Sequence, residues 1–293
     1  MKRAGFAQPW LPFLLLLPQL LIIVIFFYWP AAEAVRSSFY LEDPFGFGSS
    51  FVGLENYKIL FNSSEYRRVA GFTLFFTLAV TFLSLSLALL FAVKADKVLR
   101  GASTYKTLLM WVYAIAPPVA GLMGIMLVNH STGMITHLFE VAGYEFRNGL
   151  NYSDTASTMI LIAVWKQVPV NFIFFLSGLQ SIPVSLREAA KIDNKSGTSR
   201  FWTITFPLLA PTGFFLLVTN ITYSLFDTFG IIDVVIKGEP GNNPLTLVYK
   251  VYMDGFRGND LGGSSAQSVV LMVLVLALTV FQFRLIEKRI HYT

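Results

Sequence analysis

Long hydrophobic stretches separated by shorter polar segments dominate the chain. Six of these stretches are predominantly apolar over about 20 residues or more. We call them windows, and they cover residues 11–32, 70–93, 107–128, 157–180, 207–229 and 266–286. An α-helix needs roughly 20 apolar residues to cross ~30 Å of hydrocarbon, and lipid offers the backbone no hydrogen-bond partners. We therefore predict an all-α membrane protein with six transmembrane helices in one domain that spans residues 1–293.

The first window has some features of a cleavable signal peptide. Lys2 and Arg3 precede it, and Ala32-Glu33-Ala34 has the small-x-small pattern of a cleavage site. The apolar run from Leu11 to Tyr28 exceeds the usual ~7–15 residues of such a peptide, so we expect a retained span. The other windows differ in regularity, because Pro117-Pro118 interrupts the third and several polar residues interrupt the fourth.

The distribution of positive charge predicts the orientation. Most Lys and Arg residues lie at the two termini and in the two loops that follow the second and fourth windows, whereas most acidic residues lie in the other loops. Because Lys and Arg accumulate on the cytoplasmic side of membrane proteins, both termini are expected in the cytoplasm. The net charge of +5 is then a topological signal and not a sign of nucleic-acid binding.

Composition argues against chemistry within the chain. Charged residues make up 13%, against about 25% in soluble domains, and there is no cysteine. There is no Gly-x4-Gly-Lys-Ser/Thr phosphate loop and no Gly-x-Ser-x-Gly nucleophile elbow, and the three His residues lack metal-ligand spacing. We expect no enzyme, no metal site and no cofactor bound by this chain.

The cytoplasmic loop 181–205 carries the most specific pattern. Ser185 and Glu188 have the spacing of a capping box that opens a short helix, and Asn194 is suited to end that helix in a left-handed conformation. The small Ala189-Ala190 pair leaves room for close approach by another protein. An ordinary amphipathic helix on the inner leaflet is the alternative, although it leaves the full spacing unexplained.

This spacing resembles the EAA loop of binding-protein-dependent ABC importer permeases. Their pattern is Glu-Ala-Ala, three residues, Gly, nine residues and Ile-x-Leu-Pro; here Asn194 replaces the Gly and Phe206 the Leu. The resemblance implies the type I importer permease fold and a coupling helix that seats in a groove of a separate ATPase. The contact residues it implies are Glu188, Ala189, Ala190, Asp193, Asn194 and Gly197.

The resemblance extends over essentially the whole chain. Trp10-Leu11-Pro12, Phe51-Val52-Gly53-Leu54-Glu55-Asn56-Tyr57, Val164-Trp165-Lys166-Gln167 and Ser265-Ala266-Gln267-Ser268 are similar to the A-type permeases of sn-glycerol-3-phosphate importers, within the carbohydrate-uptake permeases. This implies uptake of sn-glycerol-3-phosphate or glycerophosphodiesters. It also implies partners: a second permease, two ATPase subunits that bind ATP and Mg, and a periplasmic binding protein. A sugar permease of the same family and an ion-coupled secondary transporter are the alternatives.

Polar residues inside the fourth and fifth spans are the candidates for a substrate path. Lys166 is a charged residue inside a span, and Asn220, Ser224 and Asp227 share one helical face. By resemblance to maltose-type relatives, the set that lines the site is Lys166, Gln167, Val170, Asn220, Ser224 and Asp227. The alternatives are a structural Lys166–Asp227 pair and hydrogen bonds between helices.

Overall fold

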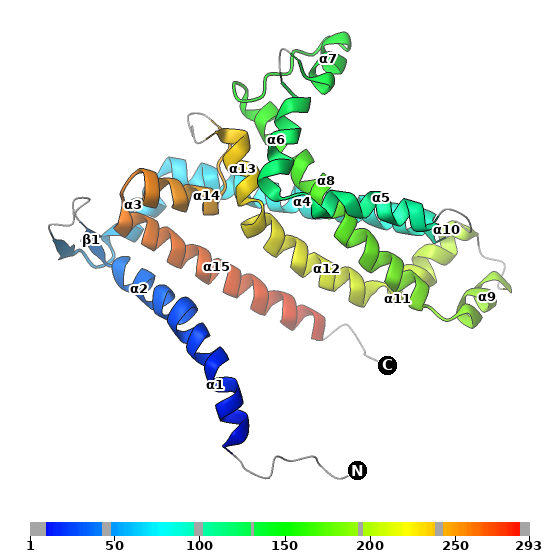
Figure 1. The fold of residues 1–293 in the computed structure, drawn as a ribbon, viewed down its shortest axis with the longest axis horizontal. Coiled ribbons are helices and arrows are strands. Elements are labelled where there is room, and N and C mark those ends of the chain that lie inside the picture. The colour runs from blue at the N-terminus through cyan, green and yellow to red at the C-terminus, as the bar shows by residue number, and fades with distance from the viewer. Residues whose placement is uncertain are drawn as a thin grey trace. The chain divides into compact units, whose positions relative to one another are not determined.

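The computed structural model describes residues 10–42, 48–96, 102–129, 132–192, 196–237 and 243–287, and these residues are mostly helical (Figure 1). The chain divides into two compact units, one formed by Met1–Tyr66 with Val251–Leu274 and the other by Arg67–Lys250 with Val275–Thr293. The single domain expected from the sequence stays a prediction.

The first unit begins with a long apolar helix. It consists of α1 (Leu11–Ile23), a π-helical turn η1 (Val24–Tyr28) and α2 (Trp29–Ser37). The helix Leu11–Ser37 has a mean hydropathy of 2.5, and its most apolar window has no buried residue. Its first part, α1, is apolar on all sides and suits a lipid environment or the surface of another membrane subunit. The first predicted span is therefore present and runs five residues beyond its expected end.

A short β-hairpin follows, which the all-α prediction missed. Strands β1 (Tyr40–Glu42) and β2 (Ser49–Phe51) pair antiparallel, with Tyr40 opposite Phe51. Helix α3 (Glu55–Asn62) anchors the hairpin, because the Asn56 amide donates to the carbonyls of Ser38 at 2.9 Å and Tyr40 at 3.0 Å. Three residues per strand are too few for a visible alternation of polar and apolar positions, so no sequence pattern predicts the hairpin.

The rest of the first unit comes from the C-terminal part of the chain. It contains the π-helical turn η4 (Met253–Arg257) and the first half of α15 (Leu261–Glu287). Gln267 of α15 donates to the Asp254 carboxylate at 2.6 Å, which ties this turn to the helix. The stretch Leu261–Arg284 is apolar enough to cross a membrane, in agreement with the sixth predicted span.

The second unit holds the remaining helices. They are α4 (Ser64–Ala95), α5 (Ala102–Ala114), α6 (Pro117–Leu127), α7 (Met134–Val141), α8 (Tyr152–Ser181), α9 (Val184–Ile192), α10 (Gly197–Arg200), η2 (Phe201–Thr205), α11 (Phe206–Leu208), α12 (Ala210–Thr222), η3 (Tyr223–Asp227), α13 (Phe229–Ile236) and α14 (Leu247–Tyr252). Helix α8 is the centre of this unit, because α5, α6, α12 and α13 all pack against it. Its most apolar window is 67% buried, against at most 33% in the other three unbroken spans among the described residues.

Two of the six predicted spans are broken. The third is Lys106–Ala114 followed by Pro117–Leu127, with a bend of 104° between them, and the fifth is Gly197–Leu208 followed by Ala210–Asp227, with a bend of 68°. Prolines explain both bends, since each lacks the N–H that would continue the helix. Pro117-Pro118 was recognised from the sequence. Pro207 was expected to open the fifth span, but the helix begins at Gly197 and bends at Leu209, just before Pro211.

Close packing holds α6, the second half of the third span, in place. Helix α6 contacts α13 along most of its length. A side chain at Gly121 would meet the Ile231 carbonyl and the Val234 side chain, both at 3.2 Å. The absence of a side chain at Gly121 therefore permits this approach, and α6 is fixed against α13 and α8 rather than against α5.

Candidate functional site

The helix at the centre of loop 181–205, which is predicted to be cytoplasmic, is α9, and it begins at Val184. Ser185 therefore lies inside the first turn and does not cap the helix, so the capping-box prediction is wrong. Pro183 precedes the helix, and its carbonyl accepts the N–H of Leu186 at 3.1 Å. A helix of this length depends on packing for its stability.

The described residues of α9 separate into an outward and an inward set. Glu188 is exposed, and so are the apolar side chains of Val184 and Leu186. Ala190 is 6% exposed and packs inward. The side chain of Ala189, and Asp193 and Asn194 entirely, lie outside the described residues, as does the expected helix end at Asn194. Gly197 is exposed at the start of α10.

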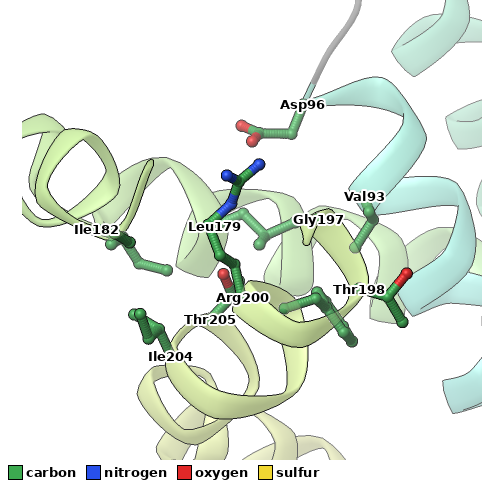
Figure 2. Close-up of a pocket in the computed structure, with 11 residues that line it drawn as sticks. Val93, Asp96, Leu179, Ile182, Gly197, Thr198, Arg200, Ile204 and Thr205 are labelled. Atoms are coloured by element: carbon green, nitrogen blue, oxygen red, sulfur yellow. The ribbon is translucent and has the colours of Figure 1, made fainter. Parts of the chain in front are cut away.

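A hollow of about 390 Å³ lies behind this loop. Its lining comes from the end of α4, the end of α8, α9 and the helix that starts at Gly197, and Ala190 is part of it. Figure 2 shows the guanidinium of Arg200 pointing toward the carboxylate of Asp96, which directly follows α4. The loop 181–205 therefore faces the end of α4 with a group of opposite charge.

Aromatic residues continue the loop into the fifth span. Phe201, Trp202 and Phe206 form a cluster with ring centroids 4.9 to 6.2 Å apart, and Trp202 is 58% exposed. Aromatic side chains of this kind prefer the interface between membrane and water. The turn η2, which holds two of them, is π-helical, and such turns often mark a place where a helix must deform.

Lys166 is buried in α8 at 7% exposure, and its partner is not an acid. Its Nζ donates to the main-chain carbonyl of Tyr113 at 3.0 Å and lies 5.5 Å from the centre of the Tyr113 ring. Asp227 is exposed, and the salt bridges found among the described residues include neither Lys166 nor Asp227. The structural Lys166–Asp227 pair considered from the sequence is therefore not formed.

Asn220 is fully buried and its side chain is saturated with hydrogen bonds. Its Oδ1 accepts from Ser84 at 2.8 Å and from Asn171 at 2.9 Å, while its Nδ2 donates to the Asn171 Oδ1 and to the Leu216 carbonyl, both at 2.7 Å. A carboxamide has two acceptor and two donor positions, and all four are used. In this arrangement Asn220 joins α4, α8 and α12, and it has no capacity left for a ligand.

The other candidate residues differ in accessibility. Gln167 is 7% exposed and Ser224 is fully buried, with its hydroxyl donating to the Ile221 carbonyl at 2.9 Å. Val170 is half-buried, and Asp227 is exposed at the end of the π-helical turn η3. The structure thus brings Lys166 and Gln167 of α8 and Ser224 into the interior of the second unit, while Asp227 reaches its surface.

Sequence reasoning missed a line of hydroxyl groups on α4. Thr73, Thr77, Thr81 and Ser84 share one face of the helix, and all are buried. The Thr73 hydroxyl accepts the N–H of Leu247 at 2.9 Å, whereas the hydroxyls of Thr77 and Thr81 have no hydrogen-bond partner among the described residues. The signal in the sequence was their spacing of about four residues, which is hard to recognise within a strongly apolar span.

On the outer side, a polar contact organises the start of α8. The phenol of Tyr144 donates to Asp154 at 2.7 Å, and the backbone N–H of Arg147 donates to the same carboxylate at 2.9 Å. The hydrogen bond to Asp154 raises the pKa of Tyr144 above its ordinary value, with smaller contributions from burial and from the negative charge. Asp154 is 3% exposed and is satisfied by these donors.

Comparison with known proteins places this geometry in context. The family described as binding-protein-dependent transport system inner membrane component matches residues 84–292. The sn-glycerol-3-phosphate transport system permease protein UgpA of Rhizobium meliloti (strain 1021) is 47% identical over 292 residues, which is 100% of each chain. The protein of the same description from Salmonella typhi is 48% identical over 291 residues, 99% of each chain.

Two solved structures share the fold. One is a bacterial ABC transporter involved in the import of the acidic polysaccharide alginate, with a TM-score of 0.78, 19% identity and 96% of each chain covered. The other is a bacterial alginate ABC transporter in complex with an alginate pentasaccharide-bound periplasmic protein. Its TM-score is 0.77, its identity 18%, and 93% of this chain and 92% of the other are covered. Sequence identity at this level supports the fold alone.

Proposed function

This chain belongs to the family of binding-protein-dependent transport system inner membrane components, and from that membership we propose that it is the permease subunit that imports sn-glycerol-3-phosphate. The observation that carries the proposal is the similarity of 47–48% over the full length to permeases described for that substrate. Glycerophosphodiesters share the phosphate group and are included. Membership of this family excludes the alternative of an ion-coupled secondary transporter. A sugar permease of the same family is the remaining alternative.

The chain is a transport component and not an enzyme, so the energy must come from elsewhere. We propose that two separate ATPase subunits bind ATP and Mg, and that this chain binds no cofactor. A second permease and a periplasmic binding protein complete the proposed importer. The exposed Glu188 on α9 supports a contact with an ATPase subunit, because a charged side chain beside exposed Val184 and Leu186 suits a protein interface with a polar rim.

The proposed mechanism couples the closing of the ATPases to the opening of the permeases. Binding of ATP draws the ATPase subunits together, and α9 moves with the surface on which it is seated. The hollow behind α9 borders both α4 and α8, so a displacement of the loop reaches these two spans directly. The permeases then change from inward-facing to outward-facing, and the binding protein releases its ligand into the path between them.

The orientation follows from the same proposal. The loop 181–205 lies in the cytoplasm with both termini, as the charge distribution requires, and the chain is a multi-pass protein of the bacterial inner membrane. The family description names an inner membrane component, which agrees with the apolar helices of the structure.

Uptake assays test the proposed substrate. A strain that carries the whole importer and lacks other glycerol-3-phosphate transporters is supplied with radiolabelled sn-glycerol-3-phosphate. We expect uptake that depends on this chain and that is reduced by unlabelled glycerophosphodiesters but not by maltose-like sugars. Competition by the sugars, with none by the phosphate compounds, would establish the sugar permease instead.

A further inference from the structure

The C-terminal end of α5 has a carbonyl that the helix itself does not satisfy. In a continuing α-helix the carbonyl of Tyr113 would accept the N–H of residue 117. Residue 117 is a proline and has no N–H, so this carbonyl needs a partner from outside the helix. An unpaired backbone carbonyl in a low-dielectric interior is costly, and a partner there has a stabilising effect.

Lys166 supplies that partner. Its Nζ reaches the Tyr113 carbonyl at 3.0 Å from the middle of α8, and the same ammonium lies 5.5 Å from the centre of the Tyr113 ring. Both contacts go to one residue at the last turn of α5, just before the 104° bend. The ammonium therefore holds α5, the first piece of the third span, against α8, while α6 on the other side of the bend is held by α13.

We propose that Lys166 exchanges the Tyr113 carbonyl for the phosphate of the transported substrate, and that this exchange releases α5 at the bend. The proposal rests on the proposed function, since it requires a phosphorylated substrate. Lys166 is then a specificity-determining residue that also reports the presence of substrate to the third span. A neutral sugar has no anionic group to compete for the ammonium, so the bend stays held.

The exchange is favoured because the phosphate is a stronger hydrogen-bond acceptor than the Tyr113 carbonyl and because the Lys166 side chain is flexible. A hydrogen bond between an ammonium and a phosphate oxygen joins two ions and is stronger than one to a neutral carbonyl. Only 7% of Lys166 is exposed in this structure, so phosphate contact requires the ammonium to turn away from Tyr113. The flexible four-carbon stem of lysine permits such a turn. A substrate that binds only the turned form shifts the population toward it.

The chain has no cysteine, which makes the bend directly measurable. The experiment uses the complete importer with its ATPase subunits and binding protein in lipid nanodiscs, with Ala116→Cys as the only cysteine of the permease. Ala116 is exposed and lies between α5 and α6. The rate of maleimide labelling is measured with ATP and vanadate, with and without sn-glycerol-3-phosphate. We expect the substrate to raise the rate severalfold.

Two matched pairs of variants test whether the change in labelling rate depends on the contact between Lys166 and the Tyr113 carbonyl. Lys166→Met should raise the labelling rate without substrate and abolish the response to substrate, whereas Lys166→Arg, which keeps the charge, should retain part of the response. Pro117→Ala returns the N–H that pairs with Tyr113 and should also abolish the response. Pro118→Ala returns an N–H whose helical partner is Ala114, so it should leave the response intact.

The outcomes separate this inference from the proposed function. A full substrate response in assembled Lys166→Met importers, or equal behaviour of the two proline variants, would overturn the exchange. Stimulation of the wild-type ATPase activity by sn-glycerol-3-phosphate-loaded binding protein, without any change in labelling, would also overturn it and leave the proposed function standing. Stimulation by a neutral sugar alone would reject the proposed substrate itself, and with it the exchange.

Discussion

Asn171 of α8 and Asn220 of α12 exchange a reciprocal pair of side-chain hydrogen bonds, at 2.9 Å and 2.7 Å, in the interior of the second unit. Both side chains are fully buried. The pair joins the central helix to the outer half of the broken fifth span, and the Ser84 hydroxyl extends it to α4. Three helices are thus connected at one point by polar groups in apolar surroundings. Loss of a hydrogen-bond partner there destabilises the fold more than it would in water.

The first prediction concerns the stability of this connection. Asn220→Leu removes every partner that Asn220 supplies to Asn171 and Ser84, and an orphaned buried polar group costs about 1–3 kcal/mol. We expect a lower thermal inactivation temperature of the purified importer. Adding Asn171→Leu should recover part of the loss, because the larger orphaned group is removed as well. The control variant is Ser157→Ala on the exposed face of α8, outside these hydrogen bonds. It should leave the thermal inactivation temperature unchanged.

The fold was largely predictable from the sequence because hydropathy alone determines where a helix can cross lipid. All six predicted windows correspond to apolar helices, and the break at Pro117-Pro118 was visible as a pair of prolines. The bend at Leu209 was not recognised from the sequence. Pro207 was interpreted as the start of the fifth span, because proline is tolerated at a helix start, and the hydrogen bond that Pro211 removes was overlooked. The pairing of Asn171 with Asn220, and of Lys166 with a backbone carbonyl, depends on how distant helices pack and leaves no local signal.

The second prediction concerns topology. Ser196 lies in the predicted cytoplasmic loop, and Leu150, which is 82% exposed, lies in a predicted outer loop. Single cysteines at these positions in this cysteine-free chain should react differently with a membrane-impermeant maleimide added to spheroplasts. We expect rapid labelling of Leu150→Cys and labelling of Ser196→Cys only after lysis. Labelling of Ser196→Cys in intact spheroplasts would contradict the proposed orientation.

The third prediction concerns the contact with the ATPase. Glu188→Lys reverses the charge of an exposed side chain on α9 and should abolish uptake while the ATPase subunits no longer co-purify with the permease. The matched control is Ser185→Lys, which places the same positive charge on another exposed position of the same helix and should retain most of the uptake. Equal loss in both variants would mean that the charge of the whole helix matters, and not a specific contact by Glu188.

The fourth prediction concerns the approach of Arg200 to Asp96 across the hollow behind α9 (Figure 2). Charge pairs near a surface contribute about 0.2–1 kcal/mol, so Arg200→Asp and Asp96→Arg should each reduce uptake only a few-fold. The reciprocal exchange, Asp96→Arg with Arg200→Asp, should restore most of it. The measurement is the initial uptake rate divided by the amount of assembled importer. If the double variant is no better than the single variants, the two charges do not act on each other.

The last prediction distinguishes the two roles considered for Lys166 inside the membrane. If Lys166 only neutralised Asp227, the double variant Lys166→Met with Asp227→Leu would regain transport, since removal of both charges leaves neither unpaired. The structure pairs Lys166 with the Tyr113 carbonyl and leaves Asp227 exposed, so we expect no recovery. Lys166→Met alone should lower uptake of sn-glycerol-3-phosphate without loss of complex assembly. Lys166→Arg should retain more, although its planar guanidinium does not reproduce the shape of an ammonium. The assay compares uptake in the three variants and the unmodified importer, with assembly followed by co-purification of the ATPase. Full recovery in the double variant would show that charge neutralisation was the role of Lys166.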